Sequence, residues 1–386
     1  MIVDRSLFER RELIKAARVV CRDVGLLLKH TRANEYVWTK AGRKSVHPCV
    51  DDPSNYRLVL LKGDIPEGVL EASKYSLVDF ESTSSYEDFS TDEALRILLP
   101  AFVDHPSSFE TVGHIAHMNL RDEFLPHKDV IGQVILDKNT NIDTVITKVG
   151  TLSNEFRTFE MEIIGARNGN GSLVSTVSEN KMRITIDYEK CYWNSRLSTE
   201  RHRLLSKFTE TAPAESRLID MCCGVGALAC FASREGLEVF ANDLNPSATA
   251  CAFQNALVNK VDVSVFNVDA REFVRKLVAE GKLDEPKTNH VMVNLPEIGI
   301  EFLDVFSGLL QANSGNKFII YCHCFSREKP PTDVRGRIPL DLPADWPLEI
   351  VHVRDVAPNK IMYSVEFVVP EHILVATESV KKSRLA

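Results

Sequence analysis

The amino-acid sequence predicts an α/β protein in which a large, doubly wound and mostly parallel sheet follows smaller α+β domains. From about residue 198 onward, strand-like apolar runs alternate with helix-like segments, a pattern typical of a parallel sheet covered by helices. A chain of 386 residues suits two or three domains, and its character changes twice before the alternating part begins. We therefore expect three domains, over residues 1–100, 101–190 and 191–386.

The first two domains read as mixed helices and strands. A polar stretch over 82–93 resembles a linker, and a helix-like segment follows at 92–102. The run over 130–150 has two apolar parts separated by a turn, and we predict strand, turn and helix there. Beyond it, apolar positions alternate around a Gly/Asn turn and end in a predicted strand from Met182 to Tyr188.

The last domain repeats one unit of structure. A helix is predicted over 198–210, where Ser198-Thr199-Glu200 is typical of a helix start. Strand, turn and helix then follow three times, over 216–236, 237–260 and 262–281. The remaining predicted elements are a strand ending in Asn294-Leu295-Pro296, a helix over 301–311 and strands over 317–325, 348–356 and 362–370.

Composition excludes several classes of protein. With 44% hydrophobic and 26% charged residues, the chain is typical of a soluble globular protein, and we find no apolar run long enough to cross a bilayer. The nine cysteines are odd in number and follow no disulfide framework. We therefore expect reduced thiols in the cytoplasm, the nucleus or the mitochondrial matrix.

The charge of the chain is unevenly distributed. Residues 1–50 contain eleven Lys and Arg but five Asp and Glu, a net +6, so the whole-chain charge of −8 leaves −14 for the remainder. This asymmetry permits a basic docking face for nucleic acid near the N-terminus. A solvated helical face explains the same charges, and charge alone does not separate the two interpretations.

The first strand of the last domain ends in a glycine turn, DMCCGVG at residues 220–226. Two glycines two residues apart allow a tight turn and close approach of a ligand to the backbone. A dinucleotide site would have a third glycine where this chain has Ala229, which disfavours a nicotinamide-dependent dehydrogenase. The pattern of Asp220, Gly224 and Gly226 instead suits S-adenosylmethionine, which has no pyrophosphate.

Acidic residues follow the next two strands. Asp243 could accept hydrogen bonds from both ribose hydroxyls, and Asp269 could bind the adenine amino group. Each acid alone would more simply be a helix cap or a solvated turn residue. Their position at successive strand ends favours a methyl-donor site.

The fourth strand ends in VNLPEIGI (293–300). Because proline cannot donate to a sheet ladder, a strand end followed by a turn is the simpler interpretation. The order of the motifs places Asn294 next to the donor's sulfonium, where Asn294 and Pro296 could hold a target nitrogen.

These motifs occur among longer segments that resemble the archaeal and eukaryotic tRNA (guanine-37 N1)-methyltransferases, which are class I enzymes with a Rossmann-like domain. The resemblance covers about residues 100 to 370, and the first hundred residues match loosely. Ser195 departs from the family, which often has proline there. The segments that carry the resemblance are HIAHMNLRDEFLPHKDVIGQVILDKN (114–139), NEFRTFEMEIIGA (154–166), CYWNSRLSTERHRL (191–204), DMCCGVG, VNLPEIG and VRDVAPNKIMY (353–363).

The resemblance assigns roles residue by residue. It implies that Glu200 is the general base, that Arg157 and Arg196 are the active-site arginines, and that Asn294 and Pro296 position the target base. It also implies that Tyr192 lies beside the pocket and that Arg201 belongs to the substrate-binding motif. Outside this context, Glu200 would be a carboxylate at a helix start.

The chemistry demands the same residue types. Guanine N1 carries a weakly acidic proton that a base must remove, and an arginine can stabilise the charge that grows on O6. Glu200 would supply the base, Arg157 the oxyanion contact, and Arg196 a phosphate contact or a contact that orients Glu200. We expect the base to leave its stack, and no metal to be needed.

The expected partner is tRNA with guanine at position 37. The resemblance implies that residues 1–100 contact the tRNA and that residues 101–190 face the RNA, where Arg121, Lys128 and Lys148 are further candidates. We expect a monomer in the cytoplasm and nucleus, with the mitochondrion possible as well, and no membrane partner. Two other functions stay open, a 3-amino-3-carboxypropyl transferase of the wybutosine pathway and a catalytically silent tRNA-binding protein.

Overall fold

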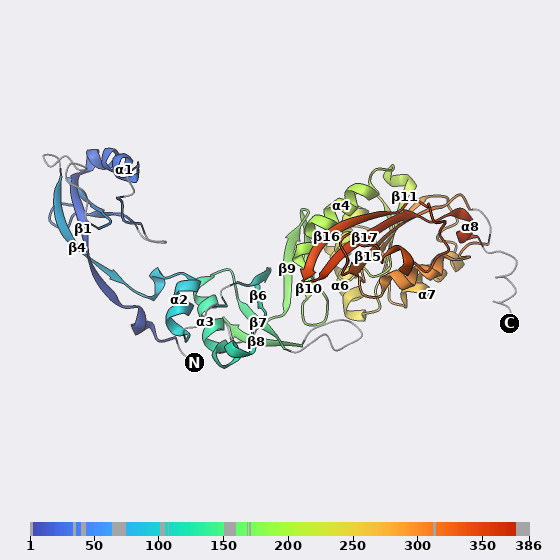
Figure 1. The fold of residues 1–386 in the computed structure, drawn as a ribbon, viewed down its shortest axis with the longest axis horizontal. Helices are drawn as coiled ribbons and strands as arrows, with labels where there is room; N and C mark the ends of the chain where they lie inside the picture. The colour runs from blue at the N-terminus through green and yellow to red at the C-terminus, as the bar shows by residue number, and fades with distance from the viewer. Residues whose placement is uncertain are drawn as a thin grey trace. The chain divides into compact units, whose positions relative to one another are not determined.

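The computed structural model describes residues 3–33, 36–39, 44–63, 75–100, 105–106, 108–149, 160–167, 169, 171–311 and 314–375 (Figure 1). The chain divides into two compact units. The first comprises residues 1–111, 115–148 and 162–171, and the second comprises 112–114, 149–161 and 172–386.

The chain begins with an antiparallel sheet in the order β2 (Val46–Pro48), β3 (Tyr56–Leu60), β1 (Arg10–Val20) and β4 (Ser76–Ser84). Successive side chains of β1 point to opposite faces, so the sheet has two cores. One core holds Ala17 and Val19 with helix α1 (Val24–Ala33) through Leu27, and the other holds Ile14 and Ala16.

A second four-stranded sheet follows in the order β5 (Glu110–Val112), β6 (Ile115–Met118), β7 (Thr144–Val149) and β8 (Glu160–Ala166). Helices α2 (Thr91–Leu98) and α3 (Lys128–Lys138) pack on each other. Their apolar faces form one core that also contains Phe8 and Tyr86.

Residues 130–149 form helix, turn and strand, so the predicted order of strand, turn and helix was wrong. Ile131, Val134 and Ile135 are buried at the i, i+3, i+4 spacing of a helix face. The second part, TVITKV, consists largely of β-branched residues and pairs with β6. Both parts are apolar, and the spacing of the apolar positions was misassigned.

The observed units differ from the predicted domains. Helix α2 shares its core with α3, so residues 91–98 pack with the middle part of the chain and not with the first sheet. The hairpin of β9 (Val174–Glu179) and β10 (Met182–Asp187) lies in the second unit, although we predicted a boundary at residue 190.

Two asparagines of helix α6 (Pro246–Asn259) explain the placement of this hairpin. Asn255 accepts from the Thr185 amide at 2.8 Å and donates to its carbonyl at 2.9 Å. Asn259 makes the same pair of bonds with the backbone of Arg183, at 3.0 and 2.7 Å. One turn apart on the helix, the two amides therefore take the place of a neighbouring strand.

The second unit contains a seven-stranded sheet in the order β13-β12-β11-β14-β15-β17-β16. The first five strands of this order are parallel, and β17 runs antiparallel to both of its neighbours. The predicted doubly wound, mostly parallel sheet is therefore confirmed. The strands are β11 (Ser216–Asp220), β12 (Glu238–Asn242), β13 (Ser264–Phe266), β14 (Thr288–Val293), β15 (Lys317–Ser326), β16 (Glu349–Ala357) and β17 (Lys360–Val368).

Helices cover both faces of this sheet, with α4 and α7 on opposite sides (Figure 1). The α-helices besides α6 are α4 (Ser198–Phe208), α5 (Ala227–Arg234), α7 (Ala270–Ala279) and α8 (Glu371–Leu374). The helix predicted over 301–311 is a 3-10 stretch, η7 (Gly299–Phe306). Shorter 3-10 turns lie at Arg5–Phe8, Cys21–Asp23, Tyr86–Asp88, Asp122–His127, Ser195–Leu197, Pro213–Glu215 and Arg335–Arg337.

The largest core belongs to the second unit and lies between the sheet and helix α7 with η7. Phe273, Phe306 and Phe318 are fully buried in it. All nine cysteines are free thiols. Among the residues that the structure describes, no helix combines the length and the apolar character that crossing a membrane requires.

Candidate active site

The carboxyl ends of β11, β12 and β14 lie side by side, because β11 pairs with both other strands. The strand order changes direction between β11 and β14, which is where open parallel sheets bind ligands. The side chain of Asn242 joins the strand ends on one side. Its amide donates to the carbonyls of Met221 and Val268, and its oxygen accepts from the Val268 amide.

The glycine turn after β11 uses its two glycines for different purposes. Gly226 has φ +76°, and a Cβ atom there would lie 2.7 Å from the Cβ of Ala252, so helices α5 and α6 require its small size. Gly224 has φ +54°, but a Cβ atom there would meet nothing within 4 Å. The open space beside Gly224 is therefore available to a ligand.

Asp243, after β12, is held in place by backbone donors. Its Oδ2 accepts from the Gly224 amide at 2.8 Å, and its Oδ1 accepts from the Asn245 amide at 2.9 Å. Burial raises the pKa of Asp243, and these two hydrogen bonds oppose that effect. Each oxygen keeps a further lone pair, so the carboxylate can accept two hydroxyl groups.

Asp220, the last residue of β11, is a buried carboxyl group with an unsatisfied atom. Its side chain is 3% exposed, and its Oδ1 has no hydrogen-bond partner among the described residues. Burial, together with the negative charge of Asp243, raises the pKa of Asp220 to about 7, against a hydrogen bond from the Cys222 backbone. A buried carboxylate with one unsatisfied oxygen favours a cationic ligand nearby.

Asp269 is exposed and caps helix α7. Its Oδ1 accepts from the amides of Arg271 and Glu272 at 2.9 and 3.2 Å. Oδ1 of Asp269 therefore acts as the helix cap. The other oxygen has no partner given by the structure, so an adenine contact stays a prediction.

These residues fit S-adenosylmethionine. The ligand needs acceptors for its ribose hydroxyls, an anionic neighbour for its ammonium group, and a backbone it can approach closely. Asp243, Asp220 and Gly224 meet these needs in turn, and the unsatisfied Oδ1 of Asp220 is the observation that tests the fit. Among the described residues, no group of His, Cys, Asp and Glu could hold a metal ion.

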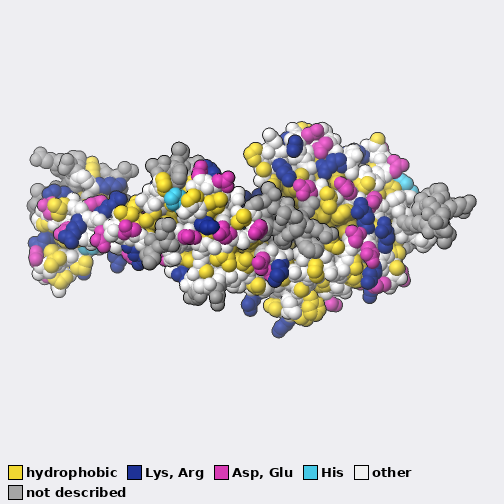
Figure 2. All heavy atoms as spheres, turned by 90° about the horizontal axis from the view of Figure 1, so that it is seen from below, with side chains coloured by type: hydrophobic (Ala, Val, Ile, Leu, Met, Phe, Trp, Pro, Cys, Tyr) yellow, Lys and Arg dark blue, Asp and Glu magenta, His cyan; other side chains and the backbone are white. Residues whose placement is uncertain are grey.

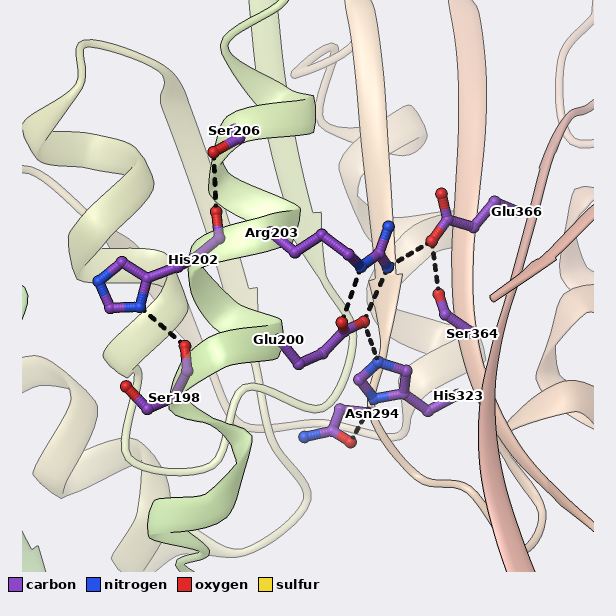
Figure 3. A network of polar contacts seen from close by, with 9 residues as sticks. All are labelled: Ser198, Glu200, His202, Arg203, Ser206, Asn294, His323, Ser364 and Glu366. Atoms are coloured by element: carbon purple, nitrogen blue, oxygen red, sulfur yellow. Dashed lines mark hydrogen bonds and ion pairs between the residues drawn. The ribbon is translucent and has the colours of Figure 1, made fainter. Parts of the chain in front are cut away.

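Glu200 lies in the first turn of helix α4 and is 7% exposed (Figure 3). Arg203, three residues on, donates to both of its oxygens at 2.8 Å. Arg203 also donates to Glu366 of β17 at 2.5 Å. Burial raises the pKa of Glu200, but the contacts with Arg203 and His323 outweigh burial, and its pKa lies below the usual value.

Asn294 follows β14 and faces His323 of β15 (Figure 3). Its Oδ1 lies 2.8 Å from Nδ1 of His323, whose Nε2 lies 3.0 Å from Oε1 of Glu200. The carbonyl of Pro296 accepts from the Phe325 amide at 3.0 Å, which ties the turn after β14 to β15. The turn interpretation of Asn294-Leu295-Pro296 thus holds, and the same turn brings Asn294 into contact with the buried network of Glu200.

The other predicted residues around Glu200 have different surroundings. Arg196 is exposed, and its side chain has no contact with another described residue, so the contact that orients Glu200 comes from Arg203 instead. Tyr192 is 49% exposed, and its hydroxyl accepts from the Asn194 amide at 3.3 Å.

Arg201 was predicted to bind substrate, but its guanidinium is occupied inside the second unit. It donates twice to Glu179 at 2.6 and 2.7 Å, and both side chains are nearly buried. It also lies 4.6 Å from the ring of Trp193. These contacts give Arg201 a structural role, in which it fastens the β9–β10 hairpin to helix α4.

One predicted active-site arginine and three predicted RNA contacts remain to be located. Arg157 lies outside the described residues. Lys128 pairs with Glu162 at 2.5 Å, and Arg121 pairs with Glu123 at 3.5 Å. Lys148 is half-buried, and burial lowers its pKa. No contact with RNA is tested by these observations.

The basic N-terminal residues are partly neutralised by acids of strand β4. Lys15 pairs with Asp79 at 2.6 Å, and Arg11 pairs with Glu81 at 3.5 Å. On the face drawn in Figure 2, Lys and Arg side chains are interspersed with Asp and Glu. The net charge of residues 1–50 therefore overstates the positive charge of the sheet that they build.

Three functional candidates were missed from the sequence, namely Arg203, Asn242 and His323. Arg203 had a usable signal, because a carboxylate and an arginine three residues apart share one helix face. Asn242 precedes the predicted Asp243, and a buried asparagine at the end of a strand could have been predicted to hydrogen-bond the backbone of neighbouring strand ends. His323 stood between two cysteines, and its contacts depend on tertiary structure alone.

Comparisons with known proteins match two parts of the chain to family models. Residues 92–169 match a model described as the TYW2 N-terminal domain, and residues 175–335 match one described as the TRM5/TYW2 methyltransferase domain. The first match begins at helix α2, and the second contains the β9–β10 hairpin except for Val174. Both limits agree better with the observed cores than with boundaries at residues 100 and 190.

Curated relatives align with nearly the whole chain. A tRNA (guanine(37)-N(1))-methyltransferase of Schizosaccharomyces pombe is 36% identical over 432 residues, covering 97% of this chain and 95% of that protein. One of Phytophthora infestans is 35% identical, covering 98% of this chain and 94% of that protein. A solved structure described as a complex of aTrm5 and tRNALeu has a TM-score of 0.68 at 18% identity. The match covers 92% of this chain and 99% of that chain, and it supports the fold.

Proposed function

This chain belongs to the tRNA (guanine(37)-N(1))-methyltransferase family and is a tRNA (guanine-37 N1)-methyltransferase, and we propose that it uses S-adenosylmethionine as donor and Glu200 as base. The observation that carries the proposal is the position of Glu200 and Asn294. Their network lies at the change of strand direction, beside the carboxyl end of β11 where Asp220 and the glycine turn lie.

The donor site is proposed from four residues of this chain. Asp243 would hold the ribose, Asp269 the adenine, and Asp220 the ammonium group, while Gly224 leaves room for the ligand. When bound, S-adenosylmethionine supplies a methyl group that its sulfonium makes electrophilic. The match of residues 175–335 to a methyltransferase domain model supports this choice of cofactor.

The base site is proposed on the other side of Asn294. Glu200 Oε2 accepts one hydrogen bond, from Arg203, and so keeps a lone-pair direction for the proton of guanine N1. We assign Arg157 to the charge on O6 from the family resemblance, and Arg196 to phosphate because it is exposed. Asn294 and Pro296 would position the base, with Tyr192 beside it.

The proposed partner is tRNA with guanine at position 37. The complex of aTrm5 with tRNALeu, which shares this fold, supports it. We propose that the enzyme acts as a monomer. For the compartment we propose cytoplasm and nucleus, or the mitochondrial matrix, where nine free cysteines would stay reduced.

The names of the curated relatives favour methyl transfer over 3-amino-3-carboxypropyl transfer. A direct assay uses S-adenosylmethionine labelled either in the methyl group or in the carboxypropyl carbons, with tRNA transcripts bearing guanine or adenine at position 37. We expect methyl label in the guanine transcript only. Transfer of the carboxypropyl label would identify the alternative reaction.

The role of Glu200 is tested by Glu200→Gln. The amide cannot take a proton from guanine N1, so we expect the single-turnover rate to fall by about 10²- to 10⁴-fold. Affinity for the donor should change by no more than about threefold, because Glu200 is not among the proposed donor contacts. Glu210→Gln, at an exposed glutamate just after the same helix, is the matched control. Parallel loss of rate and donor affinity would contradict a role as base.

A further inference from the structure

His323 lies between the two proposed functional residues, Asn294 and Glu200. Its side chain is 2% exposed, and its two ring nitrogens each face an oxygen (Figure 3). Nδ1 lies 2.8 Å from Oδ1 of Asn294, and Nε2 lies 3.0 Å from Oε1 of Glu200. Neither the resemblance nor the chemistry of guanine methylation assigned a role to this histidine.

The oxygen of Asn294 determines which ring nitrogen carries hydrogen. An amide oxygen has no hydrogen to donate, so Nδ1 of His323 must be the donor in this contact. A neutral imidazole then presents a lone pair at Nε2, directed at the carboxylate of Glu200. The 3.0 Å contact with Oε1 is a hydrogen bond only when one proton lies between the two atoms.

The charges of the cluster leave room for that proton. Helix α4 contributes Glu200 and Arg203, and β17 contributes Glu366, which are two carboxylates and one guanidinium. Asn294 of the turn after β14 and Ser364 of β17 are neutral. With a neutral His323 the buried cluster carries one negative charge, and one added proton makes it neutral, which burial favours.

We propose, on the basis of the function above, that Glu200 and His323 together accept the proton that guanine N1 loses. The N1–H bond breaks as the N1–CH₃ bond forms and the sulfur–methyl bond breaks, so one proton is released in each turnover. Oε2 of Glu200 takes it up, and rotation of the protonated carboxyl group turns the proton toward Nε2 of His323, where it is held between the two side chains. Meanwhile Nδ1–H keeps Asn294 oriented, and the proton leaves to solvent after product release.

The pair resolves a mismatch in the single-residue mechanism. Burial raises the pKa of Glu200, but Arg203 donates to both of its oxygens and contributes to a net lowering of that pKa, which makes the carboxylate alone a weak base. An imidazole ring with a lone pair at Nε2 can accept a proton and release it again. The proton is then shared by the two residues and belongs to neither alone.

The test is the single-turnover methylation rate from pH 5.5 to 8.5 with donor and tRNA saturating. At low pH the pair already holds its proton and cannot accept another, so the wild-type rate should rise with pH through a near-neutral inflection. His323→Asn keeps a donor toward Asn294 but removes Nε2, and His323→Gln puts an amide near Nε2 that cannot titrate. Both should lose the inflection and have a plateau rate lower by on the order of 10- to 100-fold.

His202→Asn is the matched control, since His202 is an exposed histidine on the same helix as Glu200. It should keep the wild-type profile. Affinities of both His323 variants for donor and tRNA should stay within about threefold of wild type, which separates proton transfer from misfolding.

Three results would overturn the proposal. They are a wild-type profile without a near-neutral inflection, an inflection that persists in both His323 variants, and a wild-type rate in His323→Gln, which would mean that a fixed donor to Glu200 suffices. The wild-type profile needs no variant to fold. Failure of the proposed function is recognised separately, by absence of guanine-37 methylation or by a wild-type rate in Glu200→Gln.

Discussion

Asp220 and Glu200 are both buried carboxyl groups, and their surroundings shift their pKa values in opposite directions. Burial and the negative charge of Asp243 raise the pKa of Asp220 to about 7, against the hydrogen bond from the Cys222 backbone. The pKa of Glu200 is lowered, because Arg203 and His323 outweigh burial. At this scale the partner atoms within about 3 Å decide the protonation state, and burial alone does not.

Asp220 should make donor binding depend on pH. A raised folded-state pKa means that the ionised form is disfavoured, and its cost appears as pH rises from the unfolded value toward about 7. A cationic donor stabilises that ionised form, so affinity for S-adenosylmethionine should increase with pH and level off above about 7. Calorimetric titrations between pH 5.5 and 8.5 would measure this.

Asp220→Asn isolates the effect. It should flatten the pH dependence and weaken donor binding at pH 8 by roughly 10- to 100-fold, the loss of one charged hydrogen bond. Its stability at pH 8 should equal or exceed that of wild type, because the uncompensated charge is gone. An unchanged pH dependence in this variant would show that another group titrates.

At the scale of elements, the β11–α5 turn separates folding from binding. Gly226→Ala places a methyl group against Ala252 at a left-handed φ, and should lower the free energy of unfolding by about 2–4 kcal/mol. Gly224→Ala meets no neighbouring atom, and should cost about 1 kcal/mol for its φ alone. Urea unfolding of both variants measures the difference.

The two glycine variants should rank in the opposite order for donor affinity, with Gly224→Ala affected more than Gly226→Ala. The Cβ atom of Gly224→Ala would occupy the open space beside Asp243, so binding should weaken by at least about tenfold in a folded protein. Gly226→Ala, measured below its unfolding midpoint, should retain the larger share of donor affinity. If Gly224→Ala bound normally, the donor would not approach this turn.

At the scale of the whole molecule, the second unit has the features of an independent domain. Its largest core is formed entirely by residues between Ile219 and Leu374. A fragment of residues 172–386 should therefore unfold cooperatively and bind S-adenosylmethionine within about threefold of the full chain. It would lose the hydrogen bond of Ser175 to the Val112 carbonyl and the contacts of His114 with Ser175 and Ser172, each of which costs roughly 1 kcal/mol.

The fragment should methylate tRNA far less efficiently than the full chain at low substrate concentration, because the first unit is the proposed additional RNA contact. Comparing kcat/KM for the two proteins at one salt concentration measures this. Equal values would mean that residues 1–171 contribute nothing to the recognition of tRNA.

The local sequence pattern predicted an element correctly where all of its residues have the same kind of surroundings. The parallel strands and their glycine and acidic ends were predictable, because a strand buried on both faces is continuously apolar and its end is polar. The order of α3 and β7 was not, since two short apolar segments of similar length carry an ambiguous period. The boundary at residue 190 failed because Asn255 and Asn259 bind the hairpin from 70 or more residues away.

The sequence by itself determined the family, through its longer matching segments, and the doubly wound sheet, through the alternation of strands and helices. It also predicted the donor-site residues that we propose, because they stand in short motifs at strand ends. Tertiary structure decided which arginine holds Glu200, that Arg201 is occupied by Glu179, and that His323 lies between Asn294 and Glu200. His323 lies 123 residues from Glu200 along the chain, and Glu366 lies 163 residues from Arg203. The contacts of Arg203 with Glu200 and of Arg201 with Glu179 span shorter distances in the sequence. A hydrogen bond depends on atomic positions within a few tenths of an ångström, and only packing of the whole unit sets them.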